Sequence, residues 1–244
     1  MRKVINGKFP AFMTALAVIG SLGLQVRGQE VAENEGSANK ARPKAPFMEI
    51  KRLPNGDIVL GKITLHREAR ELSFPAEVNQ KGGGLEVVIA QPDGRLHESL
   101  LRADVSGFRL QTMLLLLGLN NGSRRPDEEV HQGDLVDLDI QWKNEAGEKV
   151  REPVENFIFN RTEGRIMKRI GWVFVGSEIR DEMFMADAEG NLVIIYSVGS
   201  TVLDIPGKAG LDDTMFVAYK EKKEPQVGAA VTVFITPRRQ VKAK

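Results

Sequence analysis

The chain of 244 residues contains no cysteine and only three histidines, His66, His97 and His131. The absence of thiols excludes disulfide bonds, a thiol nucleophile, an iron–sulfur cluster, and zinc or haem held by cysteine. Three imidazoles leave few options for acid–base catalysis or for a histidine-rich metal site. A chain of this size can bury a sufficient core without disulfides, so the missing cysteines do not limit folding.

The chain also lacks a strong charge of either sign. It has 34 basic and 33 acidic residues and a formal net charge of +1. Four of the basic residues (Arg2, Lys3, Lys8 and Arg27) fall near the N-terminus, so the remainder carries a small acidic excess. A nucleic-acid-binding domain shows a basic patch or stripe instead. We therefore expect no nucleic acid among the partners.

Long apolar runs are scarce, and the longest lies near the N-terminus. Residues 11–24 are mostly apolar and follow a basic start, and Val26 and Gly28 precede a potential cut before Gln29. This order is typical of a secretory signal peptide, and the run is shorter than the ~20 residues that span a membrane. We predict a cleaved signal at 1–28, a periplasmic or extracellular protein, and no integral membrane span after cleavage. The alternative is that the run stays uncut as an N-terminal anchor.

The rest of the chain divides into a leader, one domain and a tail. Residues 29–46 are polar and poor in core-forming side chains, which predicts a flexible leader. A single globular domain is expected over 47–237, because no internal repeat or change of composition divides it. The basic end at 238–244 is predicted to be a solvated tail, with weak attraction to anionic lipid as the alternative.

Short runs of β-branched residues between turn-forming residues indicate many strands. The sequence predicts strands at 58–60, 63–65, 70–78, 85–90, 134–142, 172–175, 183–185, 192–196, 215–219 and 231–235. Strict alternation along 137–142 places the acidic residues of that strand on its wet face. Pro75 suits an edge or a bend.

One helix is expected at about 105–117, started by Asp104 or Ser106 and ended by Gly118. Residues 114–117 are all leucine, which predicts that this helix is buried in the core. A second, short helix is considered at 152–160. We therefore predict an α+β fold of mostly antiparallel β-sheet with one buried helix.

Several short motifs occur in the order found in a known family. They are Gly-Leu-Glu at 84–86, His-Glu-Ser-Leu-Leu at 97–101, the leucine run with Gly-Leu at 114–119, Gly-Trp-Val-Phe-Val-Gly-Ser at 171–177, Met-Ala-Asp at 185–187 and Leu-Asp-Ile-Pro at 203–206. Over about 67–237 the chain resembles the YdjY-like family of uncharacterised exported bacterial proteins. The resemblance implies export and supplies no catalytic residues.

His97, Glu98 and Ser99 are the main candidates for catalysis, because they supply a base, a carboxylate and a nucleophile. On a strand His97 and Ser99 would share a face and Glu98 would take the other, so a further partner such as Asp187 or Asp204 is needed. The alternative is that His97 and Ser99 hydrogen-bond to backbone groups near the turn. No Gly-x-Ser-x-Gly motif supports a hydrolase.

No metal site and no cofactor are predicted. His97 and Glu98, with Asp187 or Asp204, could bind a metal ion through nitrogen and oxygen atoms, but their spacing in the sequence does not indicate such a site. Residues 187–191 begin like a calcium loop, yet Leu192 and Val198 stand where that loop needs glycine and glutamate. A hairpin turn is the better interpretation of this stretch.

Trp172 and Phe174 are the candidates for a binding surface, because an exposed aromatic side chain can anchor a glycan or a protein. Alternating aromatic residues are more often part of the core. We predict a non-enzymatic binding or structural module of the cell envelope, with an envelope protein, a glycan or a small ligand as partner. The alternative is a hydrolase-like or metal-assisted enzyme built around His97, Glu98 and Ser99.

Overall fold

The structure is a computed structural model and describes residues 49–122, 132–197 and 199–238. These residues belong to one compact unit that starts at Pro46. The predicted signal peptide, the predicted leader and the end of the basic tail lie outside the described residues. No helix in the described ranges is long and apolar enough to cross a membrane.

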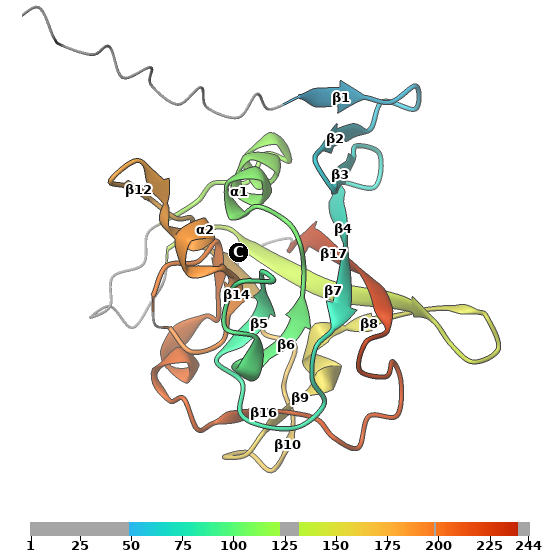
Figure 1. Cartoon of the computed structure of the whole chain (residues 1–244), viewed down its shortest axis with the longest axis vertical. Helices are drawn as coiled ribbons and strands as arrows, with labels where there is room; N and C mark the ends of the chain where they lie inside the picture. Colours follow the sequence, from blue (N-terminus) through green and yellow to red (C-terminus); the bar gives the residue numbers. More distant parts are fainter. Residues whose placement is uncertain (1–48, 123–131, 198, 239–244) are drawn as a thin grey trace, which may run out of the picture. The chain divides into compact units, whose positions relative to one another are not determined.

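Eight strands form a closed barrel, most of which can be followed in Figure 1. In order around the barrel they are β4 (Glu71–Val78), β17 (Ala230–Pro237), β7 (Leu135–Lys143), β11 (Trp172–Phe174), β15 (Leu203–Asp204), β14 (Asn191–Ile194), β5 (Val87–Ala90) and β6 (Ser99–Arg102). The pairing of β6 with β4 closes the ring, with Glu77 opposite Arg102. The β14–β15 and β5–β6 pairs are parallel, and the other pairs are antiparallel.

The predicted α+β fold with a sheet and one buried helix is wrong. The protein is mostly β, and its main sheet closes into a barrel. No α-helix forms at 152–160, where the chain runs from β8 (Lys149–Pro153) through a 3-10 turn at Val154–Phe157 into β9 (Ile158–Asn160). Closure depends on which distant strand edges pair, and the alternation of apolar and polar residues within a strand does not contain that information.

Strand alternation accounts for the core. Along β7 the side chains of Val136, Leu138 and Ile140 are buried, and those of Asp137 and Asp139 between them are partly exposed. The barrel strands β4 and β17 alternate in the same way over most of their length. One large apolar core results, with Phe74, Leu138, Trp172, Phe174 and Val233 among its fully buried or nearly buried members, and a small second cluster forms on β5 and β14.

A strand meander extends the barrel from β4. It comprises β1 (Ile50–Arg52), β2 (Ile58–Leu60) and β3 (Ile63–His66). β3 pairs with the first half of β4, and β6 pairs with its last residues. Pro75, which has no backbone N–H to donate, stands where β4 changes from one partner to the other. A gap therefore separates β3 from β6 on this side of β4.

Helix α1 (Gly107–Leu116) begins and ends close to where the sequence predicts. The side chain of Ser106 accepts a hydrogen bond from the Arg109 backbone N–H, which caps the start. Gly118 has a φ of +90°, and the Leu119 N–H donates to the Leu114 carbonyl at 3.2 Å, which satisfies the last turn.

The predicted burial of this helix is wrong for one of its faces. The side chains of Leu110, Met113 and Leu114 are buried, whereas Leu115 and Leu116 are each nearly half exposed. A helix on the surface of a barrel buries one stripe only, so an unbroken leucine run must leave some of its members in water.

Two further elements lie beside α1, as Figure 1 shows. A small hairpin pairs β12 (Ile179–Arg180) with β13 (Met183–Phe184), and helix α2 (Met185–Glu189) follows directly. The sequence predicts a strand over 183–185, so α2 was missed because its first residues continue an apolar run. A separate sheet of β9, β10 (Arg165–Ile166) and β16 (Phe216–Ala218) completes the described chain together with 3-10 turns at Leu96–Glu98 and Gly207–Leu211.

Candidate functional site

The His97-Glu98-Ser99 motif does not form one constellation. His97 and Glu98 lie on the 3-10 turn before β6, where the His97 ring is 81% exposed and its Nε2 lies 3.4 Å from Glu98 Oε1. Ser99 begins β6, is fully buried, and donates from Oγ to the Leu101 carbonyl at 2.5 Å. The chain changes from turn to strand between these residues, so the imidazole faces water and the hydroxyl faces the core.

Asp187 holds the start of α1. Its Oδ1 accepts from the Gly107 N–H at 2.5 Å and from the Gln91 side chain at 2.7 Å. Its Oδ2 accepts from the Phe108 N–H at 3.1 Å and from the Ser106 hydroxyl at 3.0 Å. Both oxygens satisfy donors that a helix N-terminus leaves free. This carboxylate therefore joins α2 to α1, a contact across about 80 residues that no local sequence signal announces.

The other residues singled out by sequence also lie inside the fold. Asp204 is fully buried on β15 and accepts from the Ser197 hydroxyl at 2.9 Å and from the Ile205 N–H at 2.8 Å. Trp172 and Phe174 are both fully buried on β11, so neither side chain forms part of a surface. Among the described residues, no group of three or more histidine and acidic side chains is placed to hold a metal ion.

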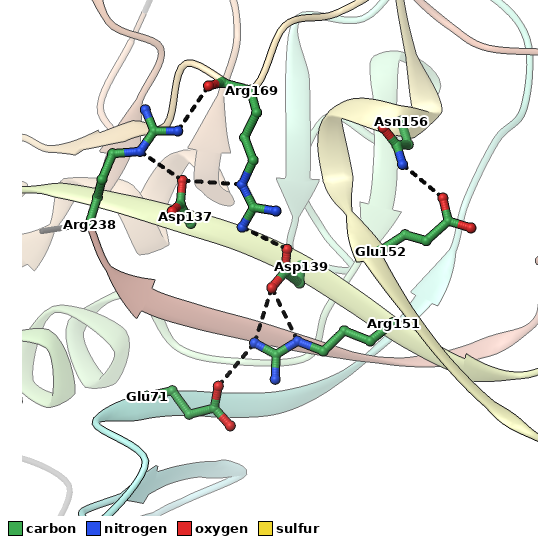
Figure 2. Close-up of polar contacts among 8 residues, drawn as sticks. All are labelled: Glu71, Asp137, Asp139, Arg151, Glu152, Asn156, Arg169 and Arg238. Carbon is green, nitrogen blue, oxygen red and sulfur yellow. Dashed lines mark hydrogen bonds and ion pairs between the residues drawn. The ribbon is translucent and has the colours of Figure 1, made fainter.

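Six charged side chains form a network on the outer face of the barrel. The ion-pair network, as we call it, comprises Glu71, Asp137, Asp139, Arg151, Arg169 and Arg238, drawn in Figure 2. Asp139 contacts Arg151 at 3.1 Å and Arg169 at 2.9 Å. Arg238, predicted as part of a solvated tail, instead contacts Asp137 at 3.0 Å. Burial alone would lower the pKa of Arg169, but the neighbouring carboxylates outweigh it and raise that pKa.

Glu155 is a buried carboxyl beside this network. It lies on the 3-10 turn at Val154–Phe157 with 1% of its surface exposed, and neither oxygen accepts a hydrogen bond from another described residue. Burial is the main cause that raises its pKa to about 7; its own backbone N–H and Arg169 oppose the rise, and Asp137 and Asp139 add to it. The six charges of the network already balance, so Glu155 is the surplus acid and is expected to hold a proton at acidic pH.

The neighbouring Glu152 shows the opposite behaviour. Burial raises its pKa, but hydrogen bonds from Lys222 at 2.6 Å and from Asn156 at 2.8 Å outweigh burial and lower it. Figure 2 shows the contact with Asn156. A partner for the charge, and not burial by itself, therefore decides which of these two glutamates stays ionised.

Apolar side chains gather on three neighbouring segments around α1. Ten large apolar side chains are exposed within the described ranges, and seven of them form what we call the α1 surface: Ile50, Leu53, Phe108, Leu115, Leu116, Ile179 and Met183. They come from β1 and the turn after it, from α1, and from the β12–β13 hairpin. Sequence reasoning missed this surface, although helical spacing of Leu110, Met113 and Leu114 separates a buried stripe from an exposed one.

Specific contacts join α1 to the hairpin, and sheet pairing through β3 links α1 to β1. The rings of Phe108 and Phe184 meet edge to face with centroids 5.3 Å apart, which joins α1 to the hairpin. The Gln111 side chain accepts from the Ser177 N–H at 2.7 Å on the same side. On the other side α1 contacts β3, and β1 joins β3 through β2.

A cleft of about 450 Å³ lies beside the start of α1, between the β2–β3 turn, the turn after β5 and the loop that leads from β6 into α1. Lys62, Asp104, Arg109 and Asp187 are among the side chains that line it. Lys62 pairs with Asp104 at 2.5 Å. Among the residues that the structure describes, the Arg109 guanidinium has no hydrogen bond or ion pair, and it packs against the turn at Gly61, where a side chain would collide with it. The cleft therefore presents an unpaired cation beside an apolar surface.

Comparisons with protein-family models, with curated proteins and with solved structures found no match.

Proposed function

We propose that the protein is an exported, non-enzymatic binding module of the bacterial cell envelope and a member of the YdjY-like family. The α1 surface is its binding surface. The observation that supports this proposal is the concentration of seven exposed apolar side chains on three adjoining segments, while three others are scattered over the rest of the described chain. Apolar side chains that gather on one surface mark a contact with another molecule, whereas scattered ones are ordinary.

Hydrogen bonds and an aromatic contact support the α1 surface. Asp187 accepts three hydrogen bonds from the start of α1 and a fourth from Gln91, and the Phe108–Phe184 contact fixes the hairpin against the helix. A binding surface is more effective when it is rigid, because less entropy is lost on contact. Asp187, a candidate for catalysis from the sequence, therefore supports this surface through its contacts with α1.

Cell fractionation tests the proposal. The full chain is expressed in a bacterial host as wild type and as the surface variant Leu115→Gln, Leu116→Gln, Ile179→Thr. The control variant Ile166→Thr, Leu211→Gln, Val227→Gln changes three apolar side chains of similar exposure (39%, 60% and 56%, against 46%, 49% and 66%) elsewhere on the protein. Wild type and control are expected in the envelope fraction, and the surface variant is expected in the soluble exported fraction.

Two results would contradict the proposal. Equal distribution of all three proteins would show that the α1 surface does not retain the protein at the envelope. Recovery of the unprocessed wild type in the cytoplasm would contradict export. The unfolding midpoints of the three proteins serve as the control for folding, because these exposed substitutions are expected to change stability little.

A further inference from the structure

We infer that the α1 surface docks on a phospholipid bilayer, with its apolar side chains in the interfacial region and Arg109 facing lipid phosphate. This inference rests on the proposed function and names the partner of the same surface. The observations that carry it are the form of the surface, the unpaired Arg109 in the adjoining cleft, and the position of β1 at the start of the described chain.

The form of the surface fits a membrane interface. A helix with an apolar outer stripe stands between two short hairpins, and each hairpin carries two of the exposed apolar side chains. Figure 1 shows β1, α1 and β12 toward the same end of the barrel. Helices that bind membranes peripherally lie in the interface with their apolar face toward the acyl chains. A fluid bilayer can adapt to the three separate segments of this surface, whereas a protein partner would need a surface of complementary shape.

Arg109 provides the polar contact, with the phosphate of the lipid. It follows Phe108 on α1 and is the lining cation of the cleft that has no partner among the described residues. An arginine guanidinium is well suited to phosphate because it offers several donors in a planar fork. A phospholipid presents phosphate directly above an apolar layer, which is the arrangement that Arg109 and Phe108 would meet.

The remaining charges around the surface have an acidic excess of two. The basic side chains are Lys51, Arg52, Lys62 and Arg180, and the acidic ones are Glu49, Asp93, Asp104, Glu178, Asp181 and Glu182. Lys51, Lys62 and Arg180 are paired with Glu49, Asp104 and Glu178. Burial of apolar side chains should therefore provide most of the affinity, with Arg109 adding a smaller electrostatic part.

The order of segments in the chain is compatible with a membrane as the partner. The apolar run at 11–24 precedes the domain, and residues 25–48 join that run to β1, whose Ile50 belongs to the α1 surface. A stretch of this length reaches at most roughly 80 Å when extended. If the run stays uncut as an anchor, it keeps the α1 surface within this distance of a membrane; if it is cut, the α1 surface must bind the membrane through its own side chains.

Vesicle flotation tests the inference. The protein is purified in its exported form and mixed with vesicles of phosphatidylethanolamine and phosphatidylglycerol. Wild type and the Ile166→Thr, Leu211→Gln, Val227→Gln control are expected to float with the vesicles. The Leu115→Gln, Leu116→Gln, Ile179→Thr variant is expected to bind at least about tenfold more weakly, because each lost side chain removes apolar burial.

A second pair of variants isolates the phosphate contact. Arg109→Gln should weaken vesicle binding about fivefold, as expected for one basic residue near an anionic surface. Arg161→Gln removes an exposed arginine on the turn after β9 and should leave binding unchanged. Equal behaviour of these two variants would overturn the assigned role of Arg109.

Other outcomes separate this inference from the proposed function. If the surface variant leaves the envelope fraction in cells but wild type binds no vesicles, the lipid partner is wrong and the binding function stands. If wild type sediments as a dimer that the surface variant breaks, the surface joins two copies and the inference is overturned. If the surface variant stays with the envelope and wild type ignores vesicles, both proposals fail.

Discussion

The ion-pair network and the α1 surface lie on the outside of the same domain, but only the network is complete within the chain. Each of its three arginines contacts at least one carboxylate of the network. On the α1 surface seven large apolar side chains face water, and Arg109 in the adjoining cleft has no partner among the described residues. The charges of the network are satisfied within the fold, whereas the α1 surface leaves apolar side chains in water, as the proposed binding role requires.

The largest effect on stability that distinguishes the two regions is expected from Glu155, which lies beside the ion-pair network. Its pKa is raised from 4.5 to about 7 in the folded protein, so the folded state holds the proton more tightly than the unfolded chain. The contribution of the protonated Glu155 to the unfolding free energy is fully present below its unfolded pKa of 4.5. It is lost as the pH rises through its folded pKa of about 7, a decrease of about 3 kcal/mol in all. Glu155→Gln should remove this fall, which unfolding in urea over a range of pH would measure.

The same experiment contains its own control. Below pH 4.5 wild type and Glu155→Gln should be equally stable, because both side chains are then uncharged. Carboxylates such as Glu152, whose pKa is lowered, lose their contribution only at acidic pH and affect both proteins alike. If the difference in unfolding free energy between wild type and Glu155→Gln does not change with pH, the raised pKa of Glu155 is contradicted.

A smaller loss is expected when the network is broken at its centre. Asp139→Ala leaves Arg151 and Arg169 each without one carboxylate partner, and we expect a loss of about 2 kcal/mol in unfolding free energy. Glu163→Ala is the matched control, because its pairs with Arg165 and Lys168 are more exposed and should contribute less than about 0.5 kcal/mol. Equal losses in urea unfolding would show that the network is no more than a surface feature.

The smallest effect on folding is expected on the α1 surface. Leu115→Gln with Leu116→Gln should change the unfolding free energy by less than about 0.5 kcal/mol, since both side chains are already exposed and glutamine is a good helix former. Urea unfolding of this double variant beside Asp139→Ala gives the comparison directly. A loss as large as that of Asp139→Ala would mean that the α1 surface contributes to the fold after all.

The sequence predicted what local patterns determine. Strands at 58–60 and 231–235 lie within β2 and β17, Gly118 ends α1, and alternation places Asp137 and Asp139 on the outer face of β7. Each of these features depends on residues a few positions apart. Periodicity and turn chemistry are therefore sufficient to find them.

The sequence did not predict what distant pairings determine. The barrel closes through the β4–β6 pairing, and the ion-pair network joins Asp137 to Arg238, about 100 residues away. Ser99 and His97 look like one motif but separate because a turn ends between them. The α1 surface was hidden because four consecutive leucines show that a helix is apolar without showing which of its faces packs against the barrel.

Hydrogen–deuterium exchange with and without vesicles tests the central comparison most directly. The account predicts slower exchange in the presence of vesicles at β1, at α1 and at the β12–β13 hairpin, and unchanged exchange at β7, β8 and β17 around the ion-pair network. Protection at the network strands, or none at α1 and its two hairpins, would contradict the conclusion that the α1 surface is the part of this protein that meets a partner.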